Sequence, residues 1–315
     1  MNKNSLKGMI LLLIADLVWG FAFVAQSVGM EHLNAFAFNS IRNFIGVIAL
    51  LPIFFWNLYK QQKNATRTES QSPSVSMTKQ PATSALSKIF TKNLIVGGLI
   101  CGTALCLASN FQQLGIEQST VGKSAFITTL YIIFVPILGI FLKKKVPPQV
   151  WFGVGTAIIG LYLLCMKDEV FVLTIGDIYL LLCAFFFTLQ ITAVEHFAEK
   201  TDGIALSMME FFVTGVLSGI VTIFTEIPTW NDIMACALPL LYAGAISCGV
   251  GYTLQIMGQK HLQATVASLI MSFESVIATL AGWLLLKEVL STKELIGCGL
   301  VFIAVILTQL PAKNK

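Results

Sequence analysis

The sequence predicts an all-α integral membrane protein with ten transmembrane helices, arranged as two inverted five-helix repeats. Three observations carry this prediction: the composition, the spacing of long apolar segments, and a weak similarity between the two halves of the chain. Of the 315 residues, 56% are hydrophobic and only 11% are charged, whereas an ordinary soluble domain is about 25% charged. This composition excludes a soluble enzyme, a nucleic-acid-binding protein and a disordered scaffold.

Long apolar segments recur along the whole chain. A helix needs about 20 mostly apolar residues to cross roughly 30 Å of hydrocarbon. The segments that meet this requirement are 9–28, 34–56, 94–113, 119–142, 148–166, 175–194, 203–225, 233–256, 262–286 and 291–310. The first contains Asp16, and no small-residue cleavage site follows before Glu31, so we expect a membrane helix and not a cleaved signal peptide.

The lysines and arginines predict the orientation. With alternating spans, the segments on the side of the N-terminus hold 15 of these residues and the opposite loops hold 3. Because positive residues gather in cytoplasmic segments, we expect both termini in the cytoplasm and a location in the cytoplasmic membrane. Arg42 and Lys123 complete the set, and both lie within spans.

The segment 60–93 differs from the rest of the chain. It is rich in Gln, Ser, Thr, Lys and Asn and has no apolar period, which predicts a flexible cytoplasmic loop. Its role is either that of a tolerated linker or that of a regulatory tail. The predicted units are 1–166, which contains this loop, and 167–315.

The two units resemble each other in sequence. A shift of 168 aligns residues 8–55 with 176–223, and a shift of 143 aligns 111–146 with 254–289. The difference of 25 residues corresponds to the longer loop in the first unit. Since each unit has an odd number of spans, the second enters the membrane in the opposite orientation, and such folds place a solute site between the halves near the midplane.

Polar residues within the spans are the candidates for that site. An ionisable group at the centre of a span costs roughly 2.5–3.5 kcal/mol, so we expect such groups to face the interior of the bundle. The predicted solute-binding residues are Asp16, Trp19, Phe23, Asn39, Arg42, Asn110, Lys123, Tyr131, Gln190, Glu210, Gln255 and Glu274. For Arg42, Lys123 and Glu210 the alternative is a position near the outer surface. For the Asn and Gln side chains the alternative is a structural role, because such side chains often form hydrogen bonds between helices.

The sequence contains few signals of other chemistry. The seven cysteines lie in apolar segments without a CxxC pair, and the three histidines lie at span ends or in loops, so we expect no metal site and no cofactor. There is no catalytic motif and no phosphate-binding loop, which argues against an enzyme and excludes an ATP-driven pump. The predicted partners are a small solute and the lipid bilayer, with a monomer as the expected state.

Glu274 is the ionisable residue placed deepest in the predicted spans. Its carboxyl group either pairs with a cation, such as Arg42 or Lys123, or is protonated because a buried charge is costly. The second alternative predicts coupling of transport to a proton gradient.

Several local motifs carry a resemblance to a known family. They are Trp19-Gly20 with Phe23, Arg42, the segment Thr120-x-Gly122-Lys123-Ser124-Ala125-Phe126 with Tyr131 and Pro136, Ala267-Ser268, Glu274-Ser275 and Gly282-Trp283-Leu284-Leu285-Leu286-Lys287-Glu288. In order and spacing the chain resembles the drug/metabolite transporter superfamily, in its EamA-like bacterial branch. That family commonly has proline where this chain has Ser275, so the resemblance leaves the local helix bend in question. It implies a secondary transporter of small metabolites, often an exporter of amino acids.

Together these features predict a carrier that works by alternating access. We expect a central cavity lined by spans 1–4 and 6–9, with cations, carboxylates and aromatic rings that suit a zwitterion or another small polar organic solute. The alternatives are an exchanger of phosphorylated or nucleotide-linked metabolites and a membrane enzyme or receptor without transport activity.

Overall fold

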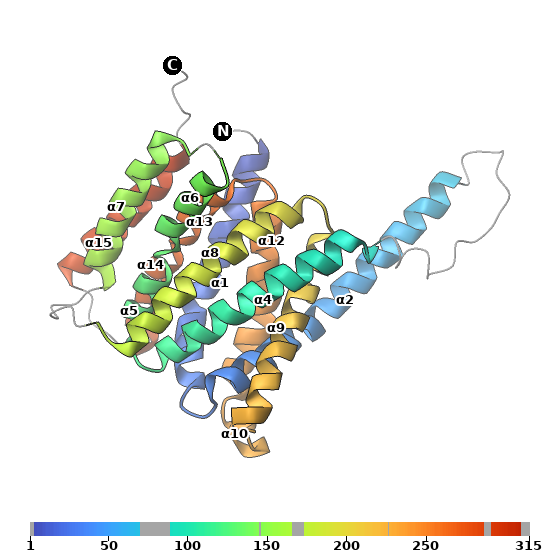
Figure 1. Cartoon of the computed structure of the whole chain (residues 1–315), viewed down its shortest axis with the longest axis horizontal. Coiled ribbons are helices and arrows are strands. Elements are labelled where there is room, and N and C mark those ends of the chain that lie inside the picture. Colours follow the sequence, from blue (N-terminus) through green and yellow to red (C-terminus); the bar gives the residue numbers. More distant parts are fainter. Residues whose placement is uncertain are drawn as a thin grey trace.

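The computed structural model is a bundle of helices (Figure 1) and describes residues 3–69, 89–144, 146–165, 173–225, 227–286 and 291–309. Within these ranges the secondary structure is helical throughout and contains no strand. The helices in the first part of the chain are α1 (Lys3–Gly29), α2 (Ala35–Glu69), α4 (Lys92–Ile116), α5 (Val121–Thr128), α6 (Tyr131–Phe141) and α7 (Pro148–Cys165). Those in the second part are α8 (Ile175–Ala198), α9 (Gly203–Thr225), α10 (Trp230–Ala235), α11 (Ala237–Leu241), the π-helix η1 (Tyr242–Tyr252), α12 (Thr253–Gln259), α13 (Ala264–Met271), α14 (Glu274–Leu286) and α15 (Thr292–Gln309).

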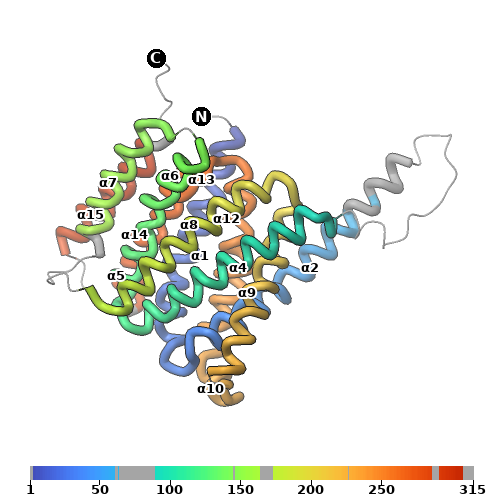
Figure 2. Tube along the Cα trace, in the orientation of Figure 1, coloured from blue at the N-terminus to red at the C-terminus, as the bar shows by residue number. Residues whose placement is uncertain are grey.

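Eight helical segments in the described part of the chain are long and apolar enough to cross a membrane. Three of them are built from consecutive elements: α5 with α6, α11 with η1 and α12, and α13 with α14. The apolar part of α7, Pro148–Leu163, is shorter. It packs along α15, and the two helices lie together at one edge of the bundle (Figure 2). The protein is therefore a multi-pass membrane protein.

Two of these segments are interrupted near their middle. One break separates Thr128 from Tyr131, and the other separates Met271 from Glu274. At the first break the Thr129 hydroxyl donates to the carbonyl oxygen of Ala125 at 2.8 Å. At the second break the Ser272 hydroxyl donates to the carbonyl oxygen of Leu269 at 2.7 Å. Hydroxyl groups that bond back to the preceding turn compete with the helical pattern and bend helices.

Ser275 lies beside the second break, where the family commonly has proline. The break is therefore present without that residue. The Ser275 hydroxyl donates to Thr129 Oγ1 at 3.2 Å, which ties the two interrupted segments to each other.

Close helix contacts depend on small residues. Ser40 of α2 donates to the carbonyl oxygen of Gly215 in α9 at 2.9 Å, and a Cβ atom on Gly219 would lie only 2.9 Å from the Ser40 hydroxyl. The spacing Gly215-x-x-x-Gly219 therefore lets α9 pack directly on α2, as such spacings do in membranes.

The helix α2 is longer than the predicted second span. It continues to Glu69, although a flexible loop was predicted from residue 60 onward. The residues after Tyr59 include Lys, Gln, Ala, Arg and Glu without proline before Pro73, and these are good helix formers. The remainder of the predicted loop, residues 70–88, lies outside the described residues.

Candidate solute-binding site

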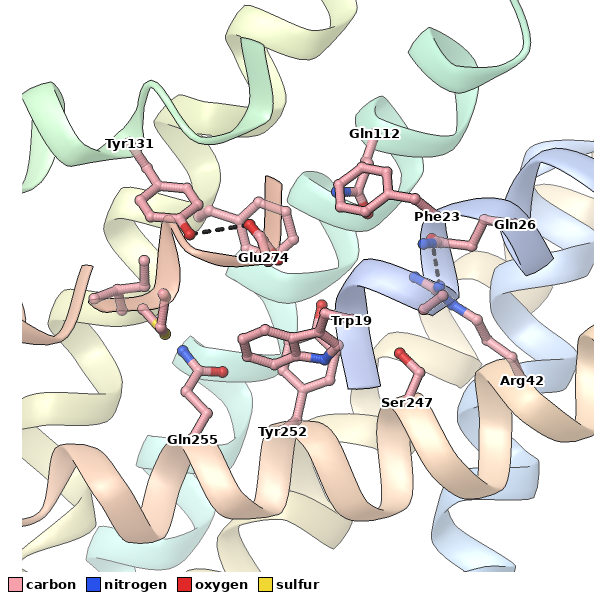
Figure 3. A pocket seen from close by; sticks show the side chains of 14 residues that line it. Trp19, Phe23, Gln26, Arg42, Gln112, Tyr131, Ser247, Tyr252, Gln255 and Glu274 are labelled. Carbon is pink, nitrogen blue, oxygen red and sulfur yellow. Dashed lines mark hydrogen bonds between the residues drawn. The ribbon is translucent and has the colours of Figure 1, made fainter. Parts of the chain in front are cut away.

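A pocket lies between the helices in the middle of the bundle (Figure 3). Its side chains come from α1, α2, α4, α6, α8, η1, α12, α13 and α14. They are Trp19, Ala22, Phe23, Gln26, Arg42, Gln112, Tyr131, Phe187, Ile191, Ser247, Tyr252, Gln255, Met271 and Glu274. The pocket therefore lies where both parts of the chain meet and combines charged, polar and aromatic side chains.

One end of the pocket is acidic. The Tyr131 hydroxyl donates to Glu274 Oε1 at 3.0 Å, and both side chains are buried. Each of the two residues is the first of its half-helix, α6 or α14. The broken segments thereby bring a carboxyl group and a phenol together inside the bundle.

The other end of the pocket is basic. Arg42 of α2 is buried, and its Nη1 donates to Gln26 Oε1 at 2.6 Å (Figure 3). The guanidinium also lies 5.8 Å from the ring centre of Phe38. Its Nε has no hydrogen-bond partner among the described residues, so the guanidinium retains a donor after these contacts.

Aromatic rings lie between the two ends. The Trp19 and Tyr252 rings are 4.9 Å apart between centres, and Phe23 lines the same space (Figure 3). The Trp19 indole nitrogen is buried and lacks a hydrogen-bond partner in the described part of the chain. The pocket thus presents an apolar middle with a few polar donors.

Arg42 and Glu274 do not neutralise each other. Among the described residues the ion pairs within 4.0 Å are Lys123 with Asp177, at 2.8 Å, and Lys144 with Glu195. Lys123 of α5 pairs with Asp177 of α8, and Lys144, just after α6, pairs with Glu195 of α8, so neither pair involves a pocket residue. Arg42 and Glu274 thus line the same pocket without forming an ion pair with each other.

Half of the residues predicted to bind solute line this pocket. They are Trp19, Phe23, Arg42, Tyr131, Gln255 and Glu274. Lys123 lies instead in its ion pair with Asp177, near the start of α5 and α8.

Four other predicted residues, Gln190, Glu210, Asn39 and Asn110, take part in hydrogen bonds between helices and do not line the pocket. Gln190 Nε2 donates to Glu210 Oε1 at 2.7 Å and Gln255 Nε2 donates to Gln190 Oε1 at 3.1 Å, which forms one chain of hydrogen bonds. Asn39 Nδ2 donates to Asn110 Oδ1 at 3.0 Å, in a second network between α2 and α4. Asp16 is fully buried on α1.

Sequence reasoning missed several lining residues. Gln26 lies three residues after Phe23 on α1, so its helical spacing was a usable signal. Gln112 aligns with Gln255 under the 143-residue shift, and that equivalence also pointed to it. Ser247 and Tyr252 belong to η1, whose π-helical geometry turns side chains by a different angle from an α-helix and has no evident signal in the sequence.

No group of three or more His, Cys, Asp or Glu side chains in the described ranges could hold a metal ion. The described helices and the pocket between them define a multi-pass membrane protein with a buried pocket of mixed charge. The EamA-like transporter family model matches residues 6–166 and 174–310. The chain belongs to the EamA-like transporter family.

Known proteins of similar sequence carry the same broad description. An uncharacterized transporter of Archaeoglobus fulgidus is 26% identical over 304 residues, which cover 95% of this chain and 84% of that protein. The uncharacterized transporter YoaV of Bacillus subtilis is 22% identical over 300 residues, 94% of each chain. One solved crystal structure, 15% identical in sequence, matches with a TM-score of 0.71 over 96% of each chain and shares the fold.

Proposed function

We propose that the protein is a secondary-active carrier that exports a small zwitterionic solute, such as an amino acid, across the bacterial cytoplasmic membrane. The observation that carries this proposal is that Arg42 and Glu274 line one pocket and are not paired with each other. A solute with both a carboxylate and an ammonium group supplies the partner that each lacks.

The proposed binding mode follows from the two ends of the pocket. The solute carboxylate accepts hydrogen bonds from Arg42, whose Nε lacks a partner among the described residues. The ammonium group binds Glu274, and the Trp19 and Tyr252 rings contact the carbon skeleton and the cation. Each charge-assisted hydrogen bond contributes about 1.5–3 kcal/mol.

The alternative exchanger of phosphorylated solutes is less favoured by the same residues. A phosphate group carries nearly two negative charges at neutral pH. In this pocket it would meet one guanidinium, from Arg42, and the carboxyl group of Glu274. A zwitterion matches that balance of charge better than a phosphate ester does.

The equivalence of residues in the two halves supports the proposed inverted repeat. The two helix breaks fall at residues that are 143 positions apart, since Thr129 is equivalent to Ser272 and Tyr131 to Glu274. Other lining residues are equivalent in the same way, under shifts of 168 or 143: Trp19 and Phe187, Phe23 and Ile191, Gln112 and Gln255. We therefore assign the pocket to the interface of two five-helix repeats, 1–166 and 167–315.

Helix packing supports the same arrangement. The packing of α4 on α8 corresponds to that of α1 on η1 and α12, and the packing of α4 on α9 corresponds to that of α2 on η1. The pairs α2–α9 and α7–α15 each join equivalent helices. We propose that α7 and α15 are the fifth and tenth crossings, so that both termini lie in the cytoplasm and the halves tilt in turn to open the pocket to each side.

A flux panel tests the function directly. The purified protein is placed in liposomes that contain labelled zwitterionic amino acids, matched amines, matched carboxylates and a sugar phosphate, and efflux is measured by mass spectrometry with and without a pH gradient. We expect the zwitterions to leave faster than analogues that lack either charge. Arg42→Gln should reduce this efflux about tenfold or more, because one charge-assisted bond is lost.

Lys200→Gln is the matched control, since Lys200 is exposed and outside the pocket. It should leave efflux unchanged. Selective movement of the sugar phosphate would favour the exchanger, and the absence of any protein-dependent flux would contradict a carrier.

A further inference from the structure

Asp16 is a buried carboxyl group that the proposed solute contacts leave unused. Its side chain is fully buried, and neither carboxyl oxygen has a hydrogen-bond partner among the described residues. It lies three residues before Trp19, which lines the pocket, and four before Gly20, where a Cβ atom would lie 2.4 Å from Ile277 of α14. Asp16 is thus at the border between the pocket and the contact of α1 with α14.

Glu274 lies at the same level of the bundle. The helix α1 runs parallel to α13 and α14, because Gly8 contacts Leu262 while Gly20 contacts Ile277. Asp16, which is four residues before Gly20, therefore lies at the level of the first turn of α14, and that helix begins with Glu274.

No cation neutralises this pair. Arg42 is bonded to Gln26, and the ion pairs within 4.0 Å in the described ranges lie elsewhere. Neighbouring titratable groups on the surrounding helices include Tyr131 of α6, Cys183 of α8 and Tyr252 of η1. Of the cationic or basic groups, Lys123 of α5 is paired with Asp177, and His261 contacts α1 at Gly8, two turns away from Asp16. Two adjacent carboxylates without a counter-ion are very costly inside a membrane.

We propose that Asp16 and Glu274 form a carboxyl pair that holds one proton, which resides on Asp16, while Glu274 carries the negative charge. Glu274 accepts the Tyr131 hydroxyl and lies at the N-terminus of α14, where the helix dipole favours a negative charge. Asp16 has no such donor. The pair then carries one negative charge, which remains available to the pocket.

This pair gives the proposed carrier a site at which a proton gradient acts, so the inference rests on the proposed function for its physiological role. A proton on Asp16 and a cationic group of the solute at Glu274 both reduce the negative charge of the carboxyl pair. The bound proton therefore weakens binding of the solute, and the bound solute weakens binding of the proton, so that the two occupancies are linked.

Infrared difference spectroscopy of the purified protein tests the pair without any solute. At neutral pH we expect Asp16→Asn to remove one protonated-carboxyl carbonyl band from the wild-type spectrum. Glu274→Gln should retain that band at a changed frequency, because the protonated carboxyl group of Asp16 then has a neutral amide nearby in place of a charged carboxylate. Glu210 is another buried carboxyl group, but it is unchanged in every sample, so its infrared band cancels in the difference spectrum.

Asp232→Asn is the matched control. Asp232 is partly exposed on α10, and hydrogen bonds from Thr229 hold its pKa below the usual value, so its removal should leave the protonated-carboxyl region unchanged. Asp16→Asn should also keep wild-type thermal stability, since asparagine resembles a neutral aspartic acid in shape. If Asp16→Asn fails to fold, the frequency shift of the band in Glu274→Gln still tests whether Asp16 and Glu274 form the pair.

Three results would overturn the proposal. They are an unchanged band in Asp16→Asn, an unshifted band in Glu274→Gln, or loss of the wild-type band on adding sodium chloride at constant pH, which would indicate a metal-cation site. Because the measurement needs no transport, a negative result would leave the carrier proposal standing, and a failed flux panel would leave the proton pair standing.

Discussion

At the scale of single residues, the pocket depends on a few buried polar contacts that bridge distant parts of the chain. Tyr131 and Glu274 are separated by 143 residues and joined by one hydrogen bond of 3.0 Å. Arg42 and Gln26 are joined by another of 2.6 Å. A buried polar group that loses its partner costs about 1–3 kcal/mol, so these contacts affect stability as well as the shape of the pocket.

Tyr131→Phe is expected to lower the free energy of unfolding by about 1–3 kcal/mol, because Glu274 loses a buried donor. Thermal unfolding in detergent measures this, with Tyr59→Phe as the control, since Tyr59 is exposed on α2. The double variant Tyr131→Phe/Glu274→Gln should cost less than the sum of the single changes. Equal effects of Tyr131→Phe and Tyr59→Phe would show that the bond contributes nothing.

The sequence indicated the polar residues but not their partners. Arg42 and Glu274 were identified because charges within spans are rare and face the interior. Which charges pair could not be read in this way, since Lys123 was a candidate partner for Glu274 and is instead bonded to Asp177 of α8. Pairing depends on how helices rotate against one another, and helical spacing alone leaves that rotation open.

At the scale of elements, the two interrupted segments position the acidic end of the pocket. The sequence predicted each as one span, with boundaries close to those observed, and gave no break in either. Hydroxyl side chains at Thr129 and Ser272 bond back to the preceding turn. Their effect could not be predicted, because the same residues often sit in straight helices.

Ser275→Pro restores the residue common in the family and should be tolerated. Ser275 is in the first turn of α14, where proline fits, and its backbone N–H donates only a 3.2 Å bond to Ser272. We expect a loss of about 1–2 kcal/mol from that bond and the hydroxyl contacts. Thr279→Pro, one turn further along, should cost about 3 kcal/mol or more. Equal melting temperatures for the two variants would contradict a break at this position.

At the scale of the whole molecule, composition and periodicity were sufficient for the class of protein. Apolar segments of span length predicted a multi-pass helical membrane protein, and the described part of the chain has eight helices of that kind. The orientation and the number of crossings remain predictions. They depend on α7 and α15, which pack on each other, and on the distribution of lysine and arginine.

Cysteine labelling tests the orientation. Ser72→Cys lies in the segment predicted to be cytoplasmic, and Asn231→Cys lies on exposed α10, at the opposite end of the spans. An impermeant maleimide should label the first only in inside-out vesicles and the second only in intact cells. Six of the native cysteines contribute little background because they are buried or half-buried: Cys101, Cys106, Cys183, Cys236, Cys248 and Cys298. The reverse pattern would invert the topology.

The Tyr131–Glu274 bond joins two residues that occupy the same position in each proposed repeat. A bond between equivalent positions crosses the two-fold axis that relates the proposed repeats. If each repeat takes on the conformation of the other, a point on that axis stays in place. In the proposed carrier, the gates on either side of the pocket move during turnover, whereas this contact can stay in place. The hydrogen bond would then be a fixed point of the proposed transport cycle, and a solute bound beside it would change sides without travelling far.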